Sequence, residues 1–233
     1  MPDIYTDTYA NIPAAGTAGD LFLPSDGFAI YRDTGAAWAP WGPYLPHGAP
    51  PAAGWAWVNQ GAAAVSTTEG GILLSQAAFG GGLSMRIRIR NAPATPYTIT
   101  AHWLPNTEIS TGAWGSPMWG LCFRQSSDGK LATMAMHNRD TTWLHVRKYT
   151  DETTYSAQYG VWEVPLDSGF LPYIVRIADD GANRVCSYST DGQHFHVLHT
   201  VGRTDFLTAD QVGFFINPDG YGAALRIISW KEE

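Results

Sequence analysis

The feature that most restricts the fold of this 233-residue chain is a series of short runs in which side-chain character alternates every second residue. Examples are LSMRIRIR at 83–90, YTITAHW at 97–103 and MWGLCFR at 118–124. A period of two places alternate side chains on opposite faces of a β-strand, and turn-forming residues separate the runs at the spacing of a β-sandwich. From Trp55 onward the sequence therefore predicts an all-β fold, in which only the short FLTAD segment could form a helical turn.

A smaller unit precedes these strands. Residues 19–47 contain the strand-like runs DLFLPS, FAIYRD and AAWAPWG, and the turn DTG stands before the last of them. The next stretch, PYLPHGAPPAAG at 43–54, is rich in Pro and Gly, which exclude regular structure and stiffen the chain. We therefore predict three parts, which are a small N-terminal β-hairpin module over 1–47, a linker over 48–54 and a sandwich over 55–233.

The charge of the chain disfavours two classes of partner. Its formal net charge is -7, and only 15% of its residues are charged. Binding to nucleic acid or to anionic lipid depends on clustered Lys and Arg, so we expect neither nucleic acid nor a membrane as partner. The N-terminus MPDIYTDTYA has neither the basic start nor the apolar stretch of a signal peptide, which predicts synthesis in the cytoplasm without export by that route.

The two cysteines, Cys122 and Cys186, lie inside strand-like runs and lack the regular spacing of a disulfide scaffold. In a reducing compartment such residues are more simply buried free thiols than a bridged pair.

Five longer segments resemble a known family when they are taken together in order. WAWVNQGAAAVS, PATPYTITAHWLP and WGLCFRQSSDGKLATMAMH are followed by PYIVRIADDGANRVCSYSTDGQHFHVL and ADQVGFFINPDGYGAALRIISW. This series resembles the concanavalin A-like jelly-roll domain of bacteriophage virion proteins, such as tail or appendage proteins. The last two segments also resemble sandwich domains of bacterial carbohydrate-active proteins. The resemblance implies a concanavalin A-like jelly-roll β-sandwich. It does not determine the function in the same way, since one sandwich can host many functions.

The stretch GDLFLPSDGFAIYRDTGAAWAPWGP at 19–43 likewise resembles a short segment that precedes such domains in phage structural proteins. The resemblance implies an attachment or assembly element. A two-stranded hairpin cannot bury its aromatic side chains alone, so we expect it to pack against its own sandwich or a neighbouring subunit. The residues expected at an oligomer or attachment contact are Tyr31, Trp38 and Trp41.

Carboxylates in a catalytic arrangement were sought because this fold also serves glycoside hydrolases, which need two acids flanking the scissile bond. The sequence has no Glu-x-Asp-x-x-Glu run. Glu163 with Asp167 is the remaining pair, whereas Asp151 with Glu152 and Asp179 with Asp180 are typical of turns. We therefore expect no catalytic residues and no enzymatic activity.

The motif HFHVLH raises the question of a metal site, because His194 and His196 would share one face of a strand. With Phe195 and Val197 directed inward and His199 on the other face, the histidine pair is more simply a solvated surface. We therefore expect no metal and no cofactor. A structural calcium ion in the DDGAN or NPDG loops stays open as an alternative.

The middle strands suggest a binding face. If Trp119, Leu121 and Phe123 face the core, their neighbour Arg124 faces the opposite side of the sheet. The same argument, applied to Met134 with Met136 and to Leu144 with Val146, places other polar and aromatic side chains on that open face. Loop residues such as Trp114 and Tyr159 could form its walls. The predicted ligand or partner face comprises Arg124, His137, Trp143, His145, Arg147, Tyr155 and Trp162.

Two interpretations of this face remain open. Arg, His and aromatic rings on a curved sheet are typical of sugar binding, in which apolar ring faces stack and fixed donors recognise hydroxyl groups. The same residue types are equally favoured at a surface that the N-terminal module or another subunit covers.

These observations favour a non-enzymatic bacteriophage virion structural protein. Its jelly-roll domain would be displayed on the particle, tethered through residues 1–47, and could bind host surface glycans. Its expected partners are further copies in a closed homo-oligomer, other virion proteins and cell-surface polysaccharide. The alternative is a carbohydrate-binding accessory module of a bacterial secreted or surface enzyme, which would bind sugar as a monomer.

Overall fold

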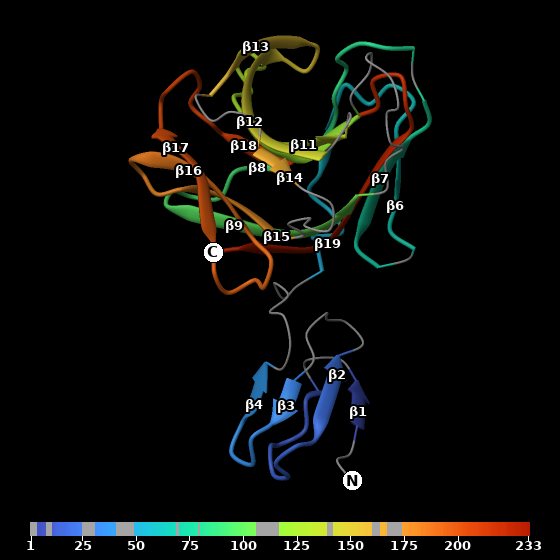
Figure 1. The fold of residues 1–233 in the computed structure, drawn as a ribbon, viewed down its shortest axis with the longest axis vertical. Coiled ribbons are helices and arrows are strands. Elements are labelled where there is room, and N and C mark those ends of the chain that lie inside the picture. Colours follow the sequence, from blue (N-terminus) through green and yellow to red (C-terminus); the bar gives the residue numbers. More distant parts are fainter. Residues whose placement is uncertain are drawn as a thin grey trace.

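The computed structural model describes residues 4–7, 11–24, 31–40, 49–68, 70–78, 80–105, 117–138, 142–159, 164–166 and 174–233. Two antiparallel sheets stack face to face in these residues, and a small sheet at the N-terminus stands apart from them (Figure 1). The predicted all-β sandwich is therefore confirmed. Within the same residues, no helix has the length and apolar character needed to cross a bilayer.

The first sheet carries the strands that were predicted to form the binding face. In spatial order it contains β5 (Ala56–Val58), β8 (Arg86–Asn91), β18 (Gln211–Asn217), β10 (Met118–Arg124), β11 (Leu131–Asn138), β12 (Thr142–Asp151) and β13 (Thr154–Gln158). The short strand β14 (Val164–Leu166) also pairs with β12.

The second sheet closes the other side of the sandwich. Its order is β6 (Ala64–Ser66), β7 (Ile72–Gln76), β19 (Ala223–Glu232), β9 (Tyr97–Pro105), β15 (Ile174–Asp179), β16 (Asn183–Ser189) and β17 (His196–Gly202). Neighbours in both sheets come from distant parts of the sequence, as when β10 pairs with β18. Long connections of this kind are the mark of a jelly roll.

The main hydrophobic core fills the space between the sheets. Trp103 and Trp230 of the second sheet pack in one buried cluster with Trp119, Leu121 and Phe123 of β10. Met134, Met136, Leu144 and Val146 belong to the same cluster. The predicted alternation of the middle strands is thus confirmed, and their remaining side chains point to the far face of the first sheet.

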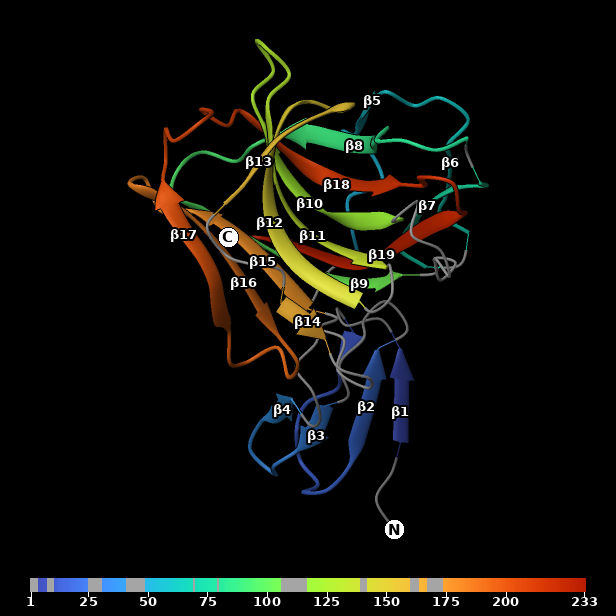
Figure 2. The same cartoon turned by 45° about the horizontal axis from the view of Figure 1, so that its top comes forward.

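A second apolar cluster covers that far face. Its buried members are Met85, Ile87, Ile89, Met118, Cys122, Leu131, Ala135, Tyr149 and Phe215. Figures 1 and 2 show that the first sheet bends strongly along β12 and is concave on the side turned away from the second sheet. The turn after β12 reaches across the sheet to the start of β8, where the backbone N–H of Met85 donates to the carbonyl oxygen of Glu152 at 2.9 Å. The concave face is therefore partly closed by its own sheet.

The cysteines lie in different clusters, Cys122 on the concave face and Cys186 in the main core. Both are free and buried, as predicted. Burial raises the pKa of each thiol to about 12.

The N-terminal module has more strands than predicted. Strands β2 (Leu21–Pro24), β3 (Tyr31–Asp33) and β4 (Trp38–Pro40) form the expected antiparallel series. Strand β1 (Ile4–Asp7), which was not predicted, adds to β2 in parallel. The boundaries at residues 47 and 54 stay a prediction.

The aromatic residues of this module pack on each other. Phe22 and Tyr31 are buried, and Trp38 and Ile12 cover them. The indole N–H of Trp38 donates to the carbonyl oxygen of Pro13 at 2.7 Å. The sheet of β1–β4 thus provides the burial that a two-stranded hairpin lacks, and the expectation that Tyr31 and Trp38 contact a partner stays a prediction.

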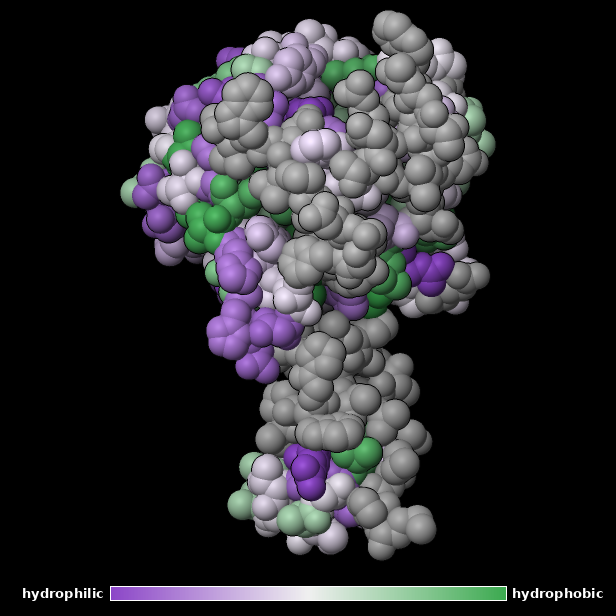
Figure 3. Space-filling view, in the orientation of Figure 1, coloured by the Kyte–Doolittle hydropathy of each residue, from purple (hydrophilic) through white to green (hydrophobic). Residues whose placement is uncertain are grey.

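Strand β17 differs from its prediction because of a β-bulge. The register shifts between Cys186 and Ser187, so that Cys186 pairs with His199 and Ser187 pairs with Val197. Val197 is 64% exposed, and an apolar area lies on the surface near β16 and β17 in Figure 3. Phe195 packs under the guanidinium of Arg176, which alternates with core residues of β15. The prediction that Phe195 and Val197 point inward, with His199 opposite His196, is wrong.

Candidate functional site

Three of the predicted residues meet on the concave face of the first sheet. His137 pairs across the strands with Trp143, and His145 follows one pleat further along β12. The ring centroids of His137 and His145 are 5.1 Å apart, and those of His137 and Trp143 are 6.4 Å apart. These three residues form the histidine cluster.

The histidine cluster is less open than the sequence suggested. His137 is 4% exposed and His145 is 0% exposed, whereas Trp143 is half-buried. The prediction of an exposed face is thus wrong for the two histidines. The physical reason is the curvature of the sheet, since a strongly bent sheet encloses side chains at the centre of its concave side.

The electrostatic state of His145 follows from this burial. Desolvation, together with the positive charge of Arg147 and the neighbouring His137, holds the pKa of His145 well below its ordinary value of 6.5. The ring is therefore neutral at pH 7, with one nitrogen as donor and the other as acceptor. Neither nitrogen has a hydrogen-bond partner among the residues that the structure describes. Because a buried polar group without a partner is costly, this arrangement indicates a place for a ligand or a bound water.

Two further residues belong to this end of the face, and the sequence did not reveal them. Asn217 and Met118 continue the row of His137 and Trp143 across β18 and β10. The side-chain carbonyl of Asn217 accepts from the backbone N–H of Ser84 at 2.7 Å. Its Nδ2 is buried without a partner among the described residues, which adds a second donor beside the histidine cluster. Only the strand order places Asn217 there, so the sequence carried no signal for it.

Arg147 and Tyr155 lie further along the same face. The Arg147 guanidinium is 6.0 Å from the centre of the Tyr155 ring, and its Nη1 lies 3.9 Å from Sδ of Met118. Tyr155 is 51% exposed and packs edge-on against Tyr149. These residues provide the aromatic and cationic surface that the sequence predicted, beside the buried histidines.

Arg124 does not join the histidine cluster. It lies at the other end of β10, six residues from Met118, which corresponds to roughly 20 Å along a strand. Its Nη1 donates to the side-chain oxygen of Gln211 at 2.7 Å. Trp162, Trp114 and Trp41 lie outside the described residues. Tyr159, expected as a wall of the face, is instead part of the main core.

Of the acidic groups that were assigned to turns, Asp179 is the buried last residue of β15 and pairs with Arg203 at 2.8 Å, and others accept turn hydrogen bonds. Asp151 accepts the backbone N–H of Thr153 at 2.8 Å, and Asp180 accepts that of Ala182 at 2.8 Å. Glu163 and Asp167 lie outside the described residues.

The loops considered for metal ions also have hydrogen bonds of their own. His194 contacts Asp191 at 2.7 Å, and Asp219 of the NPDG loop accepts the backbone N–H of Gly82 at 2.6 Å. In the described part of the chain, no group of three or more His, Cys, Asp or Glu residues could hold an ion.

No protein-family model and no curated protein matches the chain. Solved structures do match it. A functionally unknown protein from Saccharomyces cerevisiae has a TM-score of 0.56 at 11% identity, covering 77% of this chain and 96% of its own. The GH43 protein BlXynB from Bacillus licheniformis has a TM-score of 0.54 at 15% identity, covering 91% of this chain and 45% of its own. The carbohydrate-binding module CBM66 from Bacillus subtilis has a TM-score of 0.49 at 14% identity, and the match covers 77% of this chain and 95% of the module.

At these sequence identities the matches show the fold alone. The TM-score of the CBM66 match is too low to carry an argument. The chain spans less than half of the Bacillus licheniformis protein. The predicted concanavalin A-like jelly-roll sandwich is confirmed as a fold. The bacteriophage part of the resemblance stays a prediction.

Proposed function

We propose that the chain is a non-enzymatic recognition protein that binds a glycan on the concave face of its first sheet. The observation that carries this proposal is the presence of two buried neutral groups without hydrogen-bond partners among the described residues, the His145 ring near Trp143 and Nδ2 of Asn217 in the same cross-strand row. Neutral donors and acceptors match sugar hydroxyls, and an indole can stack on the apolar face of a sugar ring.

A glycan array on the full chain, followed by calorimetry with the best ligand, tests this proposal. The informative variant is His145→Leu. It removes both ring nitrogens and fills similar space with apolar atoms, so we expect the fold to hold or to gain stability. Glycan affinity should fall by about tenfold or more, since the buried hydrogen bonds of the ligand are lost.

The matched control for this experiment is His196→Gln, which changes an exposed histidine on the other sheet. It should bind like the unmodified chain. Unchanged affinity in the His145→Leu chain, or an array without any bound glycan, contradicts the proposed site.

The proposed biological setting is the bacteriophage particle, with the β1–β4 module as the attachment element. The sequence resemblance supports this setting, and so does the separate sheet that strands β1–β4 form. Tyr31 is buried inside this sheet, so attachment falls to its surface, where Tyr5 is exposed.

Light scattering on the full chain separates this setting from an accessory module. A virion component of this kind should form a stable closed oligomer at micromolar concentration. A monomer at all concentrations favours the alternative, a carbohydrate-binding module attached to a bacterial enzyme.

The absence of catalysis is also part of the proposal. A hydrolase would release reducing ends from the bound glycan and would lose that activity on Glu163→Gln, because its mechanism needs two acids. We expect no release from either chain.

A further inference from the structure

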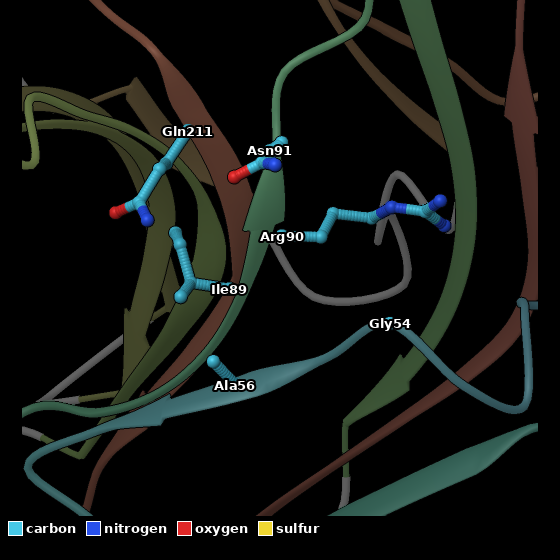
Figure 4. Close-up of a pocket in the computed structure, with 6 residues that line it drawn as sticks. All are labelled: Gly54, Ala56, Ile89, Arg90, Asn91 and Gln211. Atoms are coloured by element: carbon cyan, nitrogen blue, oxygen red, sulfur yellow. The ribbon is translucent and has the colours of Figure 1, made fainter.

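A pocket of about 280 Å³ lies at the other end of the concave face, far from the histidine cluster. It is lined by Gly54, Ala56, Ile89, Arg90, Asn91 and Gln211. Figure 4 shows Gln211, Asn91, Ile89 and Ala56 on one side of β8, while the side chain of Arg90 points away from them. Its volume is near the lower limit for small-molecule sites, which fits a single-ring ligand.

The polar wall of this pocket is a row across three strands. Arg124 of β10 pairs with Gln211 of β18, which pairs with Asn91 of β8. Because the side-chain oxygen of Gln211 accepts from Arg124 at 2.7 Å, its Nε2 remains available as a donor. Asn91 is exposed, so both halves of its amide are open to a ligand.

The floor of the pocket is apolar and depends on a glycine. Ile89 pairs with Gly213 on one side and with Ala56 on the other. A Cβ on Gly213 would lie 2.9 Å from Cδ1 of Ile89 and 2.1 Å from the carbonyl oxygen of Arg88. The glycine thus allows Ile89 to pack beneath the pocket at 1% exposure, and the exposed Ala56 provides the apolar contact for a ring.

One cation beside the pocket forms no ion pair in the described part of the chain. Arg90 is paired with Glu232 at 3.2 Å, so its charge is compensated. Arg124 has no acidic partner within the described part of the chain, and its only side-chain hydrogen bond there is to the neutral Gln211. The nearby Asp210 already accepts from the backbone N–H of Ser126 at 2.8 Å and from its hydroxyl. A guanidinium without a direct ion-pair partner can accept an anionic group, and a planar carboxylate suits its geometry.

We propose that this amide pocket, formed by Asn91, Gln211, Ile89 and Ala56 beside Arg124, binds a carboxylate-bearing sugar unit such as a hexuronate. The carboxylate lies at the Gln211 and Arg124 end, the hydroxyl groups contact Asn91, and the ring rests against the exposed Ala56. The site is separate from the histidine cluster and does not depend on it.

Calorimetry or NMR titration of the full chain with sodium glucuronate and with glucose tests the proposal. Glucuronate should bind about tenfold more tightly than glucose, because only its carboxylate gains charge-assisted hydrogen bonds. Gln211→Glu keeps the shape of the row but supplies a carboxylate to Arg124 from within the protein. That variant should remove the preference, as should Arg124→Gln.

Two controls keep the outcome decisive. Lys130→Gln changes a cation that is paired with Asp128 in the neighbouring hairpin, and it should keep the preference for glucuronate. His145→Leu should also keep it, since that residue lies at the other end of the face. Equal binding of the two sugars, or a preference that survives Gln211→Glu in a folded chain, overturns the proposal. Loss of the preference in the His145→Leu chain would show that the two ends form one site, and would also overturn it.

Discussion

His145 and His102 are both buried, and they lie on different sheets. Desolvation lowers the pKa of His102 to about 4, and it holds that of His145 well below 6.5, to which Arg147 and His137 contribute. Both rings are therefore neutral in the folded chain at pH 7. In the unfolded chain the same rings take up a proton near pH 6.5.

The stability of the chain should consequently depend on pH in a definite direction. A histidine whose pKa is lowered by folding contributes its full stability above the unfolded pKa, and this contribution is lost as the pH falls. For His102 the loss runs from about pH 6.5 to about pH 4. As the pH falls through this window, each such histidine lowers the free energy of unfolding by up to about 1.4 kcal/mol per pH unit.

Urea unfolding at a series of pH values measures this effect. We expect His145→Leu to reduce the slope of unfolding free energy against pH between 6.5 and 5, and the exposed control His196→Gln to leave it unchanged. A slope identical in all three chains would contradict the assignment of buried neutral histidines.

The cysteines give a second prediction for single residues. Since Cys122 and Cys186 are free, buried and have pKa values raised to about 12, neither should react with a thiol reagent in the folded chain at pH 8. Both should react after unfolding in urea. Rapid labelling of one thiol in the native chain would contradict the prediction, because it would show that the cluster around that thiol becomes accessible to solvent.

Among the strands, alternation was the reliable signal. It predicted the β10, β11 and β12 strands and the faces of Trp119, Leu121 and Phe123, because a buried sheet tolerates only one register of apolar residues. It could not predict the bulge in β17, since one extra residue inverts the pattern without changing composition.

The site was predicted only in part. The sequence identified His137, Trp143 and His145, because neighbouring strands bring them together. It placed Arg124 on the same face without showing that it lies at the other end, and it missed Asn217 and Gln211, because β18 inserts beside β10 from a distant part of the chain. The burial of the histidines also depends on the curvature of the sheet, which alternation does not encode.

Substitution of Gly213 tests whether β18 and β8 approach each other as closely as described. A methyl group there would lie 2.1 Å from the carbonyl oxygen of Arg88, so Gly213→Ala must separate the strands. We expect a loss of about 2–4 kcal/mol in unfolding free energy. Gly202→Ala is the matched control, because a Cβ at this strand glycine meets no atom within 4 Å. Equal stability of the two variants would contradict the described packing.

Substitution of Asp33 tests the hydrogen bonds that hold the loop of the N-terminal sheet. Its carboxylate accepts the backbone N–H groups of Gly16 and Gly35 at 2.6 Å and of Thr17 at 3.0 Å. Asp33→Asn replaces one of these acceptors by a donor, so the loop around residue 16 should exchange its amide protons faster, on the order of tenfold. The amides of the sandwich should keep their exchange rates. Faster exchange throughout the chain would instead show that the two sheets unfold together.

At the scale of the whole molecule, a curved sheet with a partly closed concave face is backed by a second sheet and preceded by a small one (Figure 2). One end of the concave face carries neutral buried donors and acceptors, and the other carries an amide row beside Arg124, which forms no ion pair with the described residues. The two ends share the apolar floor of Ile87, Ile89 and Phe215. This arrangement places two separate polar sites on one face.

The most direct test is an NMR titration of the isotope-labelled full chain with the glycan that the array identifies. The account predicts chemical-shift changes in the backbone amides of β10, β11, β12 and β18 while the glycan stays intact. Changes confined to β16 and β17 on the other sheet, or cleavage of the glycan, would contradict it.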